Sequence, residues 1–496
     1  MSHFKNLFPL RIRFGKNVMV LNLLLLLYWL TSATSFAQHE KPNVIFILAD
    51  QLRADAVGYA GNTDVITPNL DRLAKESLVF DNAVTVMAVC APWRASFLTG
   101  QYPLTNGVFY NDKPLPSEAL TMAEIYKEQG YQTGYIGKWH LNGHKRGEDA
   151  FSARDKPVTK DRRQGFDYWK VREVTHDYNN SFYFDENDQR QVWEGYDAFS
   201  QTDSAISYIK KNKDNPFLLM MSWGPPHNPY HTAPAEYRAM YDPAKINLRE
   251  NVPVHLQDSA RKVIADYYAH ITALDKAVGD LLNAIDKQGI ADNTIFVFTS
   301  EHGDMLFSKG VLRKQRPWDE SIKVPLLIRY PDKLRKAREI KGPINTPDLL
   351  PTLLDLSGIS VPKSIEGTDF SSSLLSGKDI ENEGALIMLP VPFHEWNFSN
   401  GGREYRGIRT ERYTYVRDLA GPWLLYDNEK DPYQQKNLVG LPDYSNLQST
   451  LEKVLQSKLD YTNDSFLPAD DYMTQWNYLY DKQDSIRAPD YLQMNR

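Results

Sequence analysis

Five short apolar runs separated by helical segments restrict the fold of this chain more than any other feature. They are too short for helices and are predicted to be strands buried on both faces of a sheet. Such strands need cover on both sides, so the pattern favours an α/β fold with a mostly parallel sheet sandwiched by helices. The runs occupy residues 43–50, 131–137, 216–223, 293–300 and 323–330.

The segments between the runs have helical signals. Residues 67–77 are predicted to form a helix with the first residue as N-cap and Pro68 at the first helical position. Residues 123–130 are predicted to form a helix that ends at Gly130. A longer helix ends at Gly289, and its apolar face repeats at spacings of three and four. That face consists of Ile264, Tyr267, Ile271, Leu274, Val278, Leu281 and Ile285.

The carboxyl-terminal part of the chain has a different pattern. Residues 405–418 and 422–432 contain short alternating strands separated by turn residues, which predicts an antiparallel sheet in a smaller α+β subdomain. We therefore expect a catalytic domain over residues 42–375 and a C-terminal subdomain over residues 376–496.

Residues 1–37 have the order of regions that is typical of a secretory signal peptide. Basic residues up to Lys16 precede the apolar run 18–30, and small residues follow up to Ala37. The run is short for a membrane span, so no stable membrane anchor is expected, and an uncleaved anchor is the alternative. This segment predicts export to the periplasm, with secretion as the other possible destination.

Charge and cysteine content narrow the classes of function. A net charge of −6 argues against nucleic acid as a partner, because such proteins present basic surfaces. Cys90 is the only cysteine in 496 residues. An exported protein normally uses cysteines in pairs, so a lone Cys90 is a small buried apolar residue, a free thiol, one half of an intermolecular bridge or a modified residue.

Polar clusters follow four of the predicted strands. Ligands of open α/β sheets bind beyond the carboxyl ends of the strands, so these clusters are expected to meet at one site. The clusters are residues 49–55, 137–144, 224–231 and 300–304.

The clusters contain two coherent kinds of side chain. Oxygen and nitrogen ligands suited to one divalent cation, calcium rather than the more strictly octahedral magnesium, are present in Asp50, Gln51, Glu301 and His302. Groups suited to an anionic substrate and to proton transfer are Lys138, His140, His227 and Lys314. A surface lysine or a hydrogen-bonded core histidine is the ordinary alternative for each, but the coincidence of four clusters favours a site.

Several stretches resemble the type I, formylglycine-dependent sulfatases of the alkaline phosphatase-like superfamily. The stretch "CAPWRASFLTG" at Cys90 resembles the signature in which cysteine, proline and arginine at alternate positions mark the cysteine for oxidation. The resemblance extends over most of the chain after the signal peptide. It includes "NVIFILADQLRAD", "TPNLDRLAKE", "GYQTGYIGKWHL", "PPHNPY", "FTSEHGD" and "YRGIRTERYTYVRD".

The resemblance implies roles for the site residues. Cys90 becomes 3-oxoalanine (formylglycine) through a maturation enzyme, and calcium is held by Asp50, Gln51, Glu301 and His302. Arg94 and Lys138 hold the hydrated aldehyde. His140 is the candidate base for the release step. His227 and Lys314 contact the sulfate and the leaving oxygen, and one of them protonates the departing alcohol, while Glu301 is a candidate acceptor for the proton of the attacking hydroxyl.

The chain departs from the family pattern at a few positions. Ala91 and Trp93 stand where small hydroxyl residues are common. Gln51 and Glu301 stand where the family usually has aspartate, and His302 stands where it has asparagine or histidine. The donor set therefore predicts a cation site more strongly than it predicts which metal binds there.

The aldehyde would allow sulfate to leave the enzyme without an attack of water on sulfur. One hydroxyl of the hydrated aldehyde attacks sulfur, and loss of the proton from the second hydroxyl expels sulfate and restores the aldehyde. A serine lacks the second hydroxyl and would remain sulfated.

The resulting expectation is an exported sulfatase that hydrolyses sulfate esters on sulfated polysaccharides or oligosaccharides. One alternative is a phosphate-ester or phosphonate monoester hydrolase of the same superfamily, and another is a non-catalytic glycan-binding relative. Side chains considered for sugar contacts, but not assigned to the site, are His176, His231, His394, Trp396 and Arg403.

Overall fold

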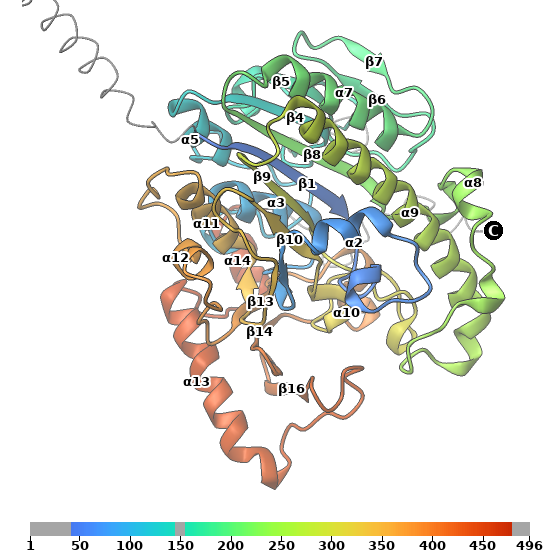
Figure 1. Ribbon diagram of the computed structural model, residues 1–496. Coiled ribbons are helices and arrows are strands. Elements are labelled where there is room, and N and C mark those ends of the chain that lie inside the picture. The colour runs from blue at the N-terminus through green and yellow to red at the C-terminus, as the bar shows by residue number, and fades with distance from the viewer. Residues whose placement is uncertain (1–40, 144–153, 479–496) are drawn as a thin grey trace, which may run out of the picture. The chain divides into compact units, whose positions relative to one another are not determined.

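A ten-stranded sheet forms the central layer of the computed structural model, which describes residues 41–143 and 154–478 (Figure 1). Strand β1 (Asn43–Asp50) lies at its centre, parallel to β8 (Phe217–Pro226) on one side and to β9 (Thr294–Ser300) on the other. Strand β4 (Gln132–Lys138) extends the parallel part next to β8. The predicted mostly parallel α/β sheet is therefore confirmed.

Toward both of its edges the sheet becomes mixed, with antiparallel as well as parallel pairs. Strand β10 (Leu326–Arg329) runs antiparallel to β9 and begins three residues later than its apolar run, because Pro325 has no N–H to give to the ladder. The strand order is β11-β2-β10-β9-β1-β8-β4-β5-β6-β7. The remaining strands are β2 (Leu78–Phe80), β5 (Tyr168–Arg172), β6 (Phe182–Phe184), β7 (Arg190–Val192) and β11 (Arg338–Ile340).

Helices cover both faces of the sheet because alternate side chains of each strand point to opposite sides. From β1, Val44 and Phe46 join a core with helices α3 (Cys90–Thr99), α5 (Met122–Glu128) and α11 (Leu349–Leu356). Ile45 and Ile47 join a second core with α2 (Pro68–Ala74), α7 (Asp197–Asn212) and α9 (Gln257–Gln288). Short elements complete this part of the chain: β3 (Ala83–Val84), α4 (Pro103–Asn106), α8 (Ala235–Arg238), α10 (Asp319–Ile322), β12 (Ile344–Asn345) and α12 (Ser371–Leu375).

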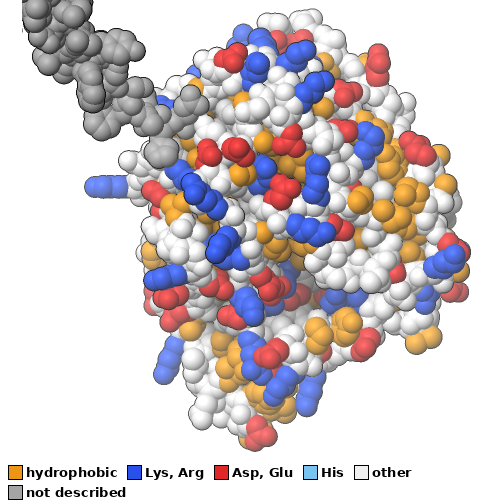
Figure 2. Space-filling view, viewed as in Figure 1, with side chains coloured by type: hydrophobic (Ala, Val, Ile, Leu, Met, Phe, Trp, Pro, Cys, Tyr) orange, Lys and Arg blue, Asp and Glu red, His pale blue; other side chains and the backbone are white. Residues whose placement is uncertain are grey.

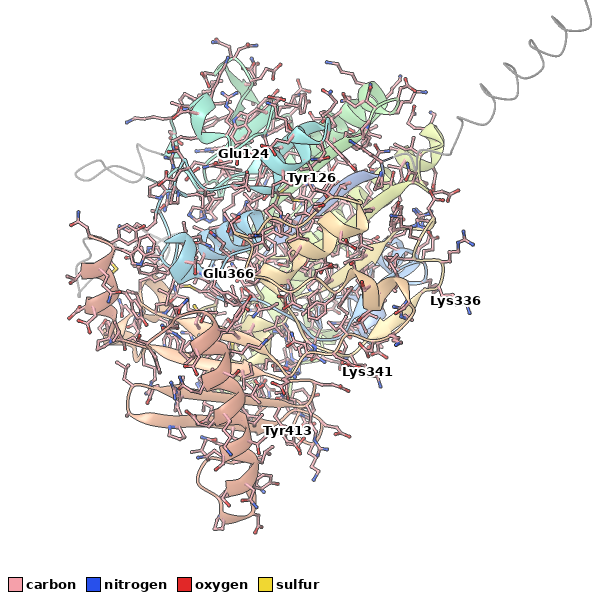
Figure 3. All side chains as sticks on the ribbon, turned by 90° about the vertical axis from the view of Figure 1, so that its left-hand side faces the viewer. Glu124, Tyr126, Lys336, Lys341, Glu366 and Tyr413 are labelled. Carbon is pink, nitrogen blue, oxygen red and sulfur yellow. The ribbon has the colours of Figure 1, made fainter. Side chains whose placement is uncertain are left out.

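The helix predictions are confirmed with small shifts of their ends. All seven apolar residues predicted for the face of α9 are buried, and the helix ends at Gly289, whose φ of 70° is the left-handed value that glycine tolerates. Helix α5 begins with a capping box between Thr121 and Glu124. Figure 3 labels Glu124 and Tyr126 on this helix, and the Tyr126 hydroxyl lies 2.9 Å from Ser357 Oγ, which follows α11.

The predicted antiparallel sheet of the C-terminal part is also confirmed. It has four strands, β13 (Ala385–Leu389), β14 (Tyr405–Arg409), β15 (Tyr413–Asp418) and β16 (Gly421–Asp427). Helices α13 (Ser445–Tyr461) and α14 (Ala469–Gln475) follow it. A third core joins this sheet to the segment that leads into α3. The domain boundary between residues 375 and 376 stays a prediction.

The segment predicted as a signal peptide, residues 1–37, lies outside the described residues. Within the described ranges, the helices are each too short or too polar to span a bilayer.

A buried ion pair locks α14 and its preceding loop to β14. Arg406 and Asp464 have fully buried side chains and form two hydrogen bonds, and the Tyr472 hydroxyl donates to the same carboxylate. Removing one member leaves an uncompensated buried charge. Asp464→Asn is therefore expected to lower the free energy of unfolding by about 3–5 kcal/mol, measured by urea denaturation.

The matched control for that variant is the partly exposed ion pair between Arg403, which precedes β14, and Asp418 at the end of β15. Asp418→Asn is expected to change the free energy of unfolding by less than about 1 kcal/mol, because exposed ion pairs are weak. Equal losses in the two variants would show that burial does not decide the effect.

Candidate active site

The predicted polar clusters meet at the carboxyl end of the parallel strands. Asp50 ends β1 and Lys138 ends β4, while His227 and Glu301 directly follow β8 and β9. Because these four strands are adjacent and parallel, their last residues come to the same edge of the sheet. The ten predicted site residues are all buried.

Cys90 lies at the centre of this group, as the first residue of α3. Its Sγ is 3.3 Å from His302 Nε2, 3.8 Å from Asp50 Oδ1 and 3.1 Å from Lys314 Nζ. Burial, together with the carboxylates of Asp50 and Glu301, raises the pKa of the thiol to about 12. In this environment the group is a neutral thiol.

Two buried cations hold the carboxylates. Lys138 Nζ donates to Asp50 Oδ2 at 2.6 Å, and Arg94 forms an ion pair with Glu301. Burial would raise the pKa of Asp50, but the charges of Lys138 and Lys314 hold it well below its usual range. Asp50 is therefore ionised and able to bind a cation.

The predicted metal ligands offer a donor set that fits a divalent cation. Ligand atoms of Asp50, Cys90, Glu301 and His302 all lie within 4.8 Å of one another. His302 Nδ1 donates to the Gly303 carbonyl at 2.9 Å, so Nε2 is left with its lone pair. Two buried oxygens in the site, Gln51 Oε1 and Glu301 Oε2, have no hydrogen-bond partner among the described residues. Mainly oxygen donors of this kind suit calcium, although the set does not identify the metal.

His227 and Lys314 form a pair on the other side of Cys90. His227 Nδ1 lies 2.9 Å from the Asn228 carbonyl, which can only accept, so Nδ1 carries the proton. Burial and the charge of Lys314 lower the pKa of His227 well below its usual value, so the ring is neutral. Nε2 therefore accepts a hydrogen bond from Lys314 Nζ at 3.1 Å.

The His140 side chain lies next to Asp112, which was not predicted to belong to the site. Its Nε2 is 3.7 Å from Asp112 Oδ1, and in the described part of the chain neither ring nitrogen has a hydrogen-bond partner. Burial and the nearby Lys138 lower its pKa to about 3, so the imidazole is neutral. Arg154 holds Asp112 through bonds of 2.9 and 2.8 Å.

The structure adds residues that the sequence did not assign to the site. The His176 ring stacks on His227, with centroids 4.6 Å apart. Burial would lower the pKa of Lys314, but the hydrogen bond to Cys90 Sγ and the charges of Asp50 and Glu395 raise it above its ordinary value. Glu395 comes from the loop between β13 and β14, and no short motif marks it. Of the side chains considered for sugar contacts, His231 is exposed and Arg403 pairs with Asp418.

A separate cleft of about 600 Å³ lies between the β2–β11 edge and the C-terminal sheet. It is lined by both acidic and basic side chains, including Asp81, Lys341 and Arg412. Figure 2 shows a similar mixture of charges over one face of the molecule, and Figure 3 labels Lys341. The ten site residues lie outside this cleft.

Comparison with known proteins accounts for this arrangement. The profile of the Sulfatase family matches residues 42–359, which is more than half of the chain. The profile described as N-sulphoglucosamine sulphohydrolase, C-terminal, matches residues 308–460.

Individual relatives match over nearly the whole chain. An ulvan-active sulfatase of Formosa agariphila is 46% identical over 449 residues, covering 89% of this chain and 86% of the relative. An endo-4-O-sulfatase of Bacteroides thetaiotaomicron is 28% identical, with 81% and 88% covered. The solved structure of a sulfatase-family protein from Bacteroides fragilis superposes with a TM-score of 0.77 at 31% identity, with 88% and 98% covered. The chain thus belongs to the sulfatases of the alkaline phosphatase-like superfamily and is a sulfuric ester hydrolase.

Proposed function

We propose that this enzyme is an exported, formylglycine-dependent sulfatase that removes sulfate from polysaccharides or oligosaccharides. The observation that carries the proposal is the position of Cys90, which contacts both the cation donor set and Lys314. A group at this position would meet an anionic ester between positive charges on two sides.

Conversion of Cys90 to formylglycine by a maturation enzyme would supply, as the hydrate, one hydroxyl for attack and a second for release of sulfate. The alternation of Cys90, Pro92 and Arg94 supports this conversion. Arg94 forms an ion pair with Glu301, and Lys138 forms one with Asp50. These ion pairs fix the charged ends of both basic side chains before substrate binds, which reduces the reorganisation needed during the reaction.

Lys314 is the source of the proton for the leaving alcohol in this proposal. Its ammonium donates to His227 Nε2, so the histidine is unprotonated and the proton resides on the lysine. His227 can accept this proton and deliver it to the departing oxygen, and the charge of a bound sulfate would favour the protonated ring.

His140 is the proposed proton acceptor in the release step. Its neutral ring can take a proton, and Asp112 at 3.7 Å would stabilise the imidazolium that results. Arg154 keeps the Asp112 carboxylate in place for this role.

Asp50, Gln51, Glu301 and His302 would hold calcium, or less favourably magnesium, whose charge would orient the sulfate and lower the barrier to attack. Removing calcium with a chelator is expected to lower the rate at least about 10²-fold, and adding calcium back should restore it. Asp50→Ala should lose activity without restoration.

Asp64→Ala is the matched control for Asp50→Ala, since the Asp64 carboxylate accepts its hydrogen bonds from Asn247, which is not a site residue. It should respond to chelation and calcium as the wild type does. Full activity in a metal-free preparation of the wild type would remove the cation from the mechanism.

A polysaccharide substrate is supported by the names of the relatives. An ulvan-active sulfatase and an endo-4-O-sulfatase both match most of this chain. The signal peptide over residues 1–37 would bring the enzyme to the periplasm, or outside the cell, where such polymers are found. Division into a catalytic domain (42–375) and a C-terminal subdomain (376–496) is part of the same proposal.

The test is a screen of matured enzyme against sulfated oligosaccharides from ulvan, carrageenan and glycosaminoglycans, with released sulfate as the readout. Matched phosphate and phosphonate esters are included in parallel. Turnover of at least one sulfated oligosaccharide supports the proposal. Faster turnover of the phosphate or phosphonate esters would overturn it.

A further inference from the structure

Asp304 is a fully buried carboxylate beside the cation site, two residues after His302. Its Oδ1 accepts the backbone N–H groups of Leu306 and Arg313, both at 2.9 Å. Its Oδ2 accepts Gln51 Nε2 at 2.6 Å and also the Tyr230 hydroxyl. Both oxygens are therefore engaged with protein donors and are poorly placed to bind a metal directly.

These bonds determine which way the Gln51 amide faces. Asp304 Oδ2 accepts at this contact, as Oδ1 does from two backbone N–H groups, so the end of the amide that meets Asp304 is the NH₂ group. The other end, Oε1, is buried and has no hydrogen-bond partner within residues 41–143 and 154–478. The Gln51 backbone is held as well, because its carbonyl accepts the Tyr267 hydroxyl at 2.7 Å. The amide is thus fixed at both its nitrogen and its backbone.

We propose that Asp304 is a positioning residue that turns the Gln51 amide oxygen toward the cation held with Asp50, Glu301 and His302. This inference rests on the proposed cation site. A glutamine gives a cation a ligand only through its oxygen, and an amide turned by 180° would present two N–H donors instead. The bond to Asp304 prevents this turned orientation of the amide. It matters at position 51, because this chain has a neutral glutamine there in place of the family's usual aspartate.

The isosteric variant Asp304→Asn provides the test. Its Oδ1 would keep the bonds from the Leu306 and Arg313 N–H groups, because those groups only donate, so its new NH₂ group would face Gln51. Two NH₂ groups cannot bond, and the Gln51 amide is expected to turn its oxygen to Asn. The dissociation constant for calcium should then rise about 10- to 100-fold, as found for residues that orient metal ligands.

A second substitution distinguishes positioning from a structural role. In Asp304→Asn with Gln51→Glu, one carboxylate oxygen of the glutamate can accept from the asparagine NH₂ and the other is free for the cation. Calcium affinity should recover at least about tenfold relative to Asp304→Asn alone, and by more than Gln51→Glu raises it in the wild type. This non-additivity marks a direct interaction. A merely structural loss at Asp304 would not be repaired by this change.

Calcium binding is measured by isothermal titration calorimetry on the full chain, with thermal melting as the check on folding. The matched control is Asp275→Asn, another buried aspartate that accepts backbone N–H groups, in this case of Asn69 and Leu70 on α2. It is expected to lose stability without losing calcium affinity. If Asp304→Asn does not fold, Gln51→Met takes its place, and its calcium affinity should fall about tenfold.

The outcomes separate this inference from the proposal on which it depends. Unchanged calcium affinity in Asp304→Asn, or in Gln51→Met, would overturn the role of Asp304 and leave the cation site intact. Weakened binding without recovery in the double variant would overturn it as well. A wild-type protein that binds no calcium would overturn both the cation site and the inference.

Discussion

Cys90→Ala is expected to lower kcat/KM for sulfate esters by at least about 10³-fold, because it removes the only group at this position that can be converted into the nucleophile. The residue lies where Lys314 and the cation donor set meet, so no neighbouring side chain can replace it without moving α3. Released sulfate is measured with enzyme that has been produced together with a maturation enzyme. Peptide mass spectrometry of the wild type should show the aldehyde in place of the thiol.

Cys90→Ser and Ser96→Ala complete this experiment. The serine variant should bind substrate but not turn over, because a serine supplies one hydroxyl where two are needed. Ser96 is fully buried on the same helix and away from the site contacts, so Ser96→Ala should keep most of the activity and controls for damage to α3. Full activity of a wild-type preparation whose Cys90 is an unmodified thiol would contradict the proposed nucleophile.

Lys314→Met is expected to lower kcat/KM about 10²- to 10⁴-fold, because it removes both a charge beside the sulfate position and the proton held next to His227. The loss should be larger for sulfated sugars than for aryl sulfates. A sugar alcohol is a poor leaving group and needs the proton, whereas a phenolate departs with little help. Rates on an oligosaccharide sulfate and on 4-nitrophenyl sulfate measure the difference.

Lys309→Met is the matched control for Lys314→Met. Lys309 lies five residues earlier, and its ammonium bonds the Gln434 carbonyl and not a site residue. Its activity on both esters should stay near that of the wild type. An equal loss on sugar and aryl sulfates in Lys314→Met would show that the lysine acts through charge alone and not through the leaving-group proton.

The order of strands and helices was predictable because it follows from local physics. Alternation and helical periodicity depend on neighbouring residues, and they located β1, β8, β9 and the C-terminal end of α9 within a few residues. The convergence of the polar clusters was predictable as well. Once the strands are parallel, their carboxyl ends must share one edge, which brings Asp50, Lys138, His227 and Glu301 together.

The family resemblance of the Cys90 stretch was likewise readable from the chain, because its motif is short and contiguous. The contacts that Cys90 makes in the folded protein could not be predicted in this way. Cys90 and Lys314 are 224 residues apart, and Lys314 lies outside the regular helices and strands. No periodicity reports where such a loop residue packs.

Tertiary structure alone decided how the side chains of the site are oriented. The amide of Gln51 is turned by Asp304, which is 253 residues away, and the tautomer of His227 is set by a backbone carbonyl. His140 faces Asp112, although its sequence neighbours gave no sign of that partner. The sequence determined which elements form and which chemical groups stand at their ends, because those properties are local. Hydrogen bonds between distant, buried groups decided which atom each residue presents, because that choice exists only after the chain has packed.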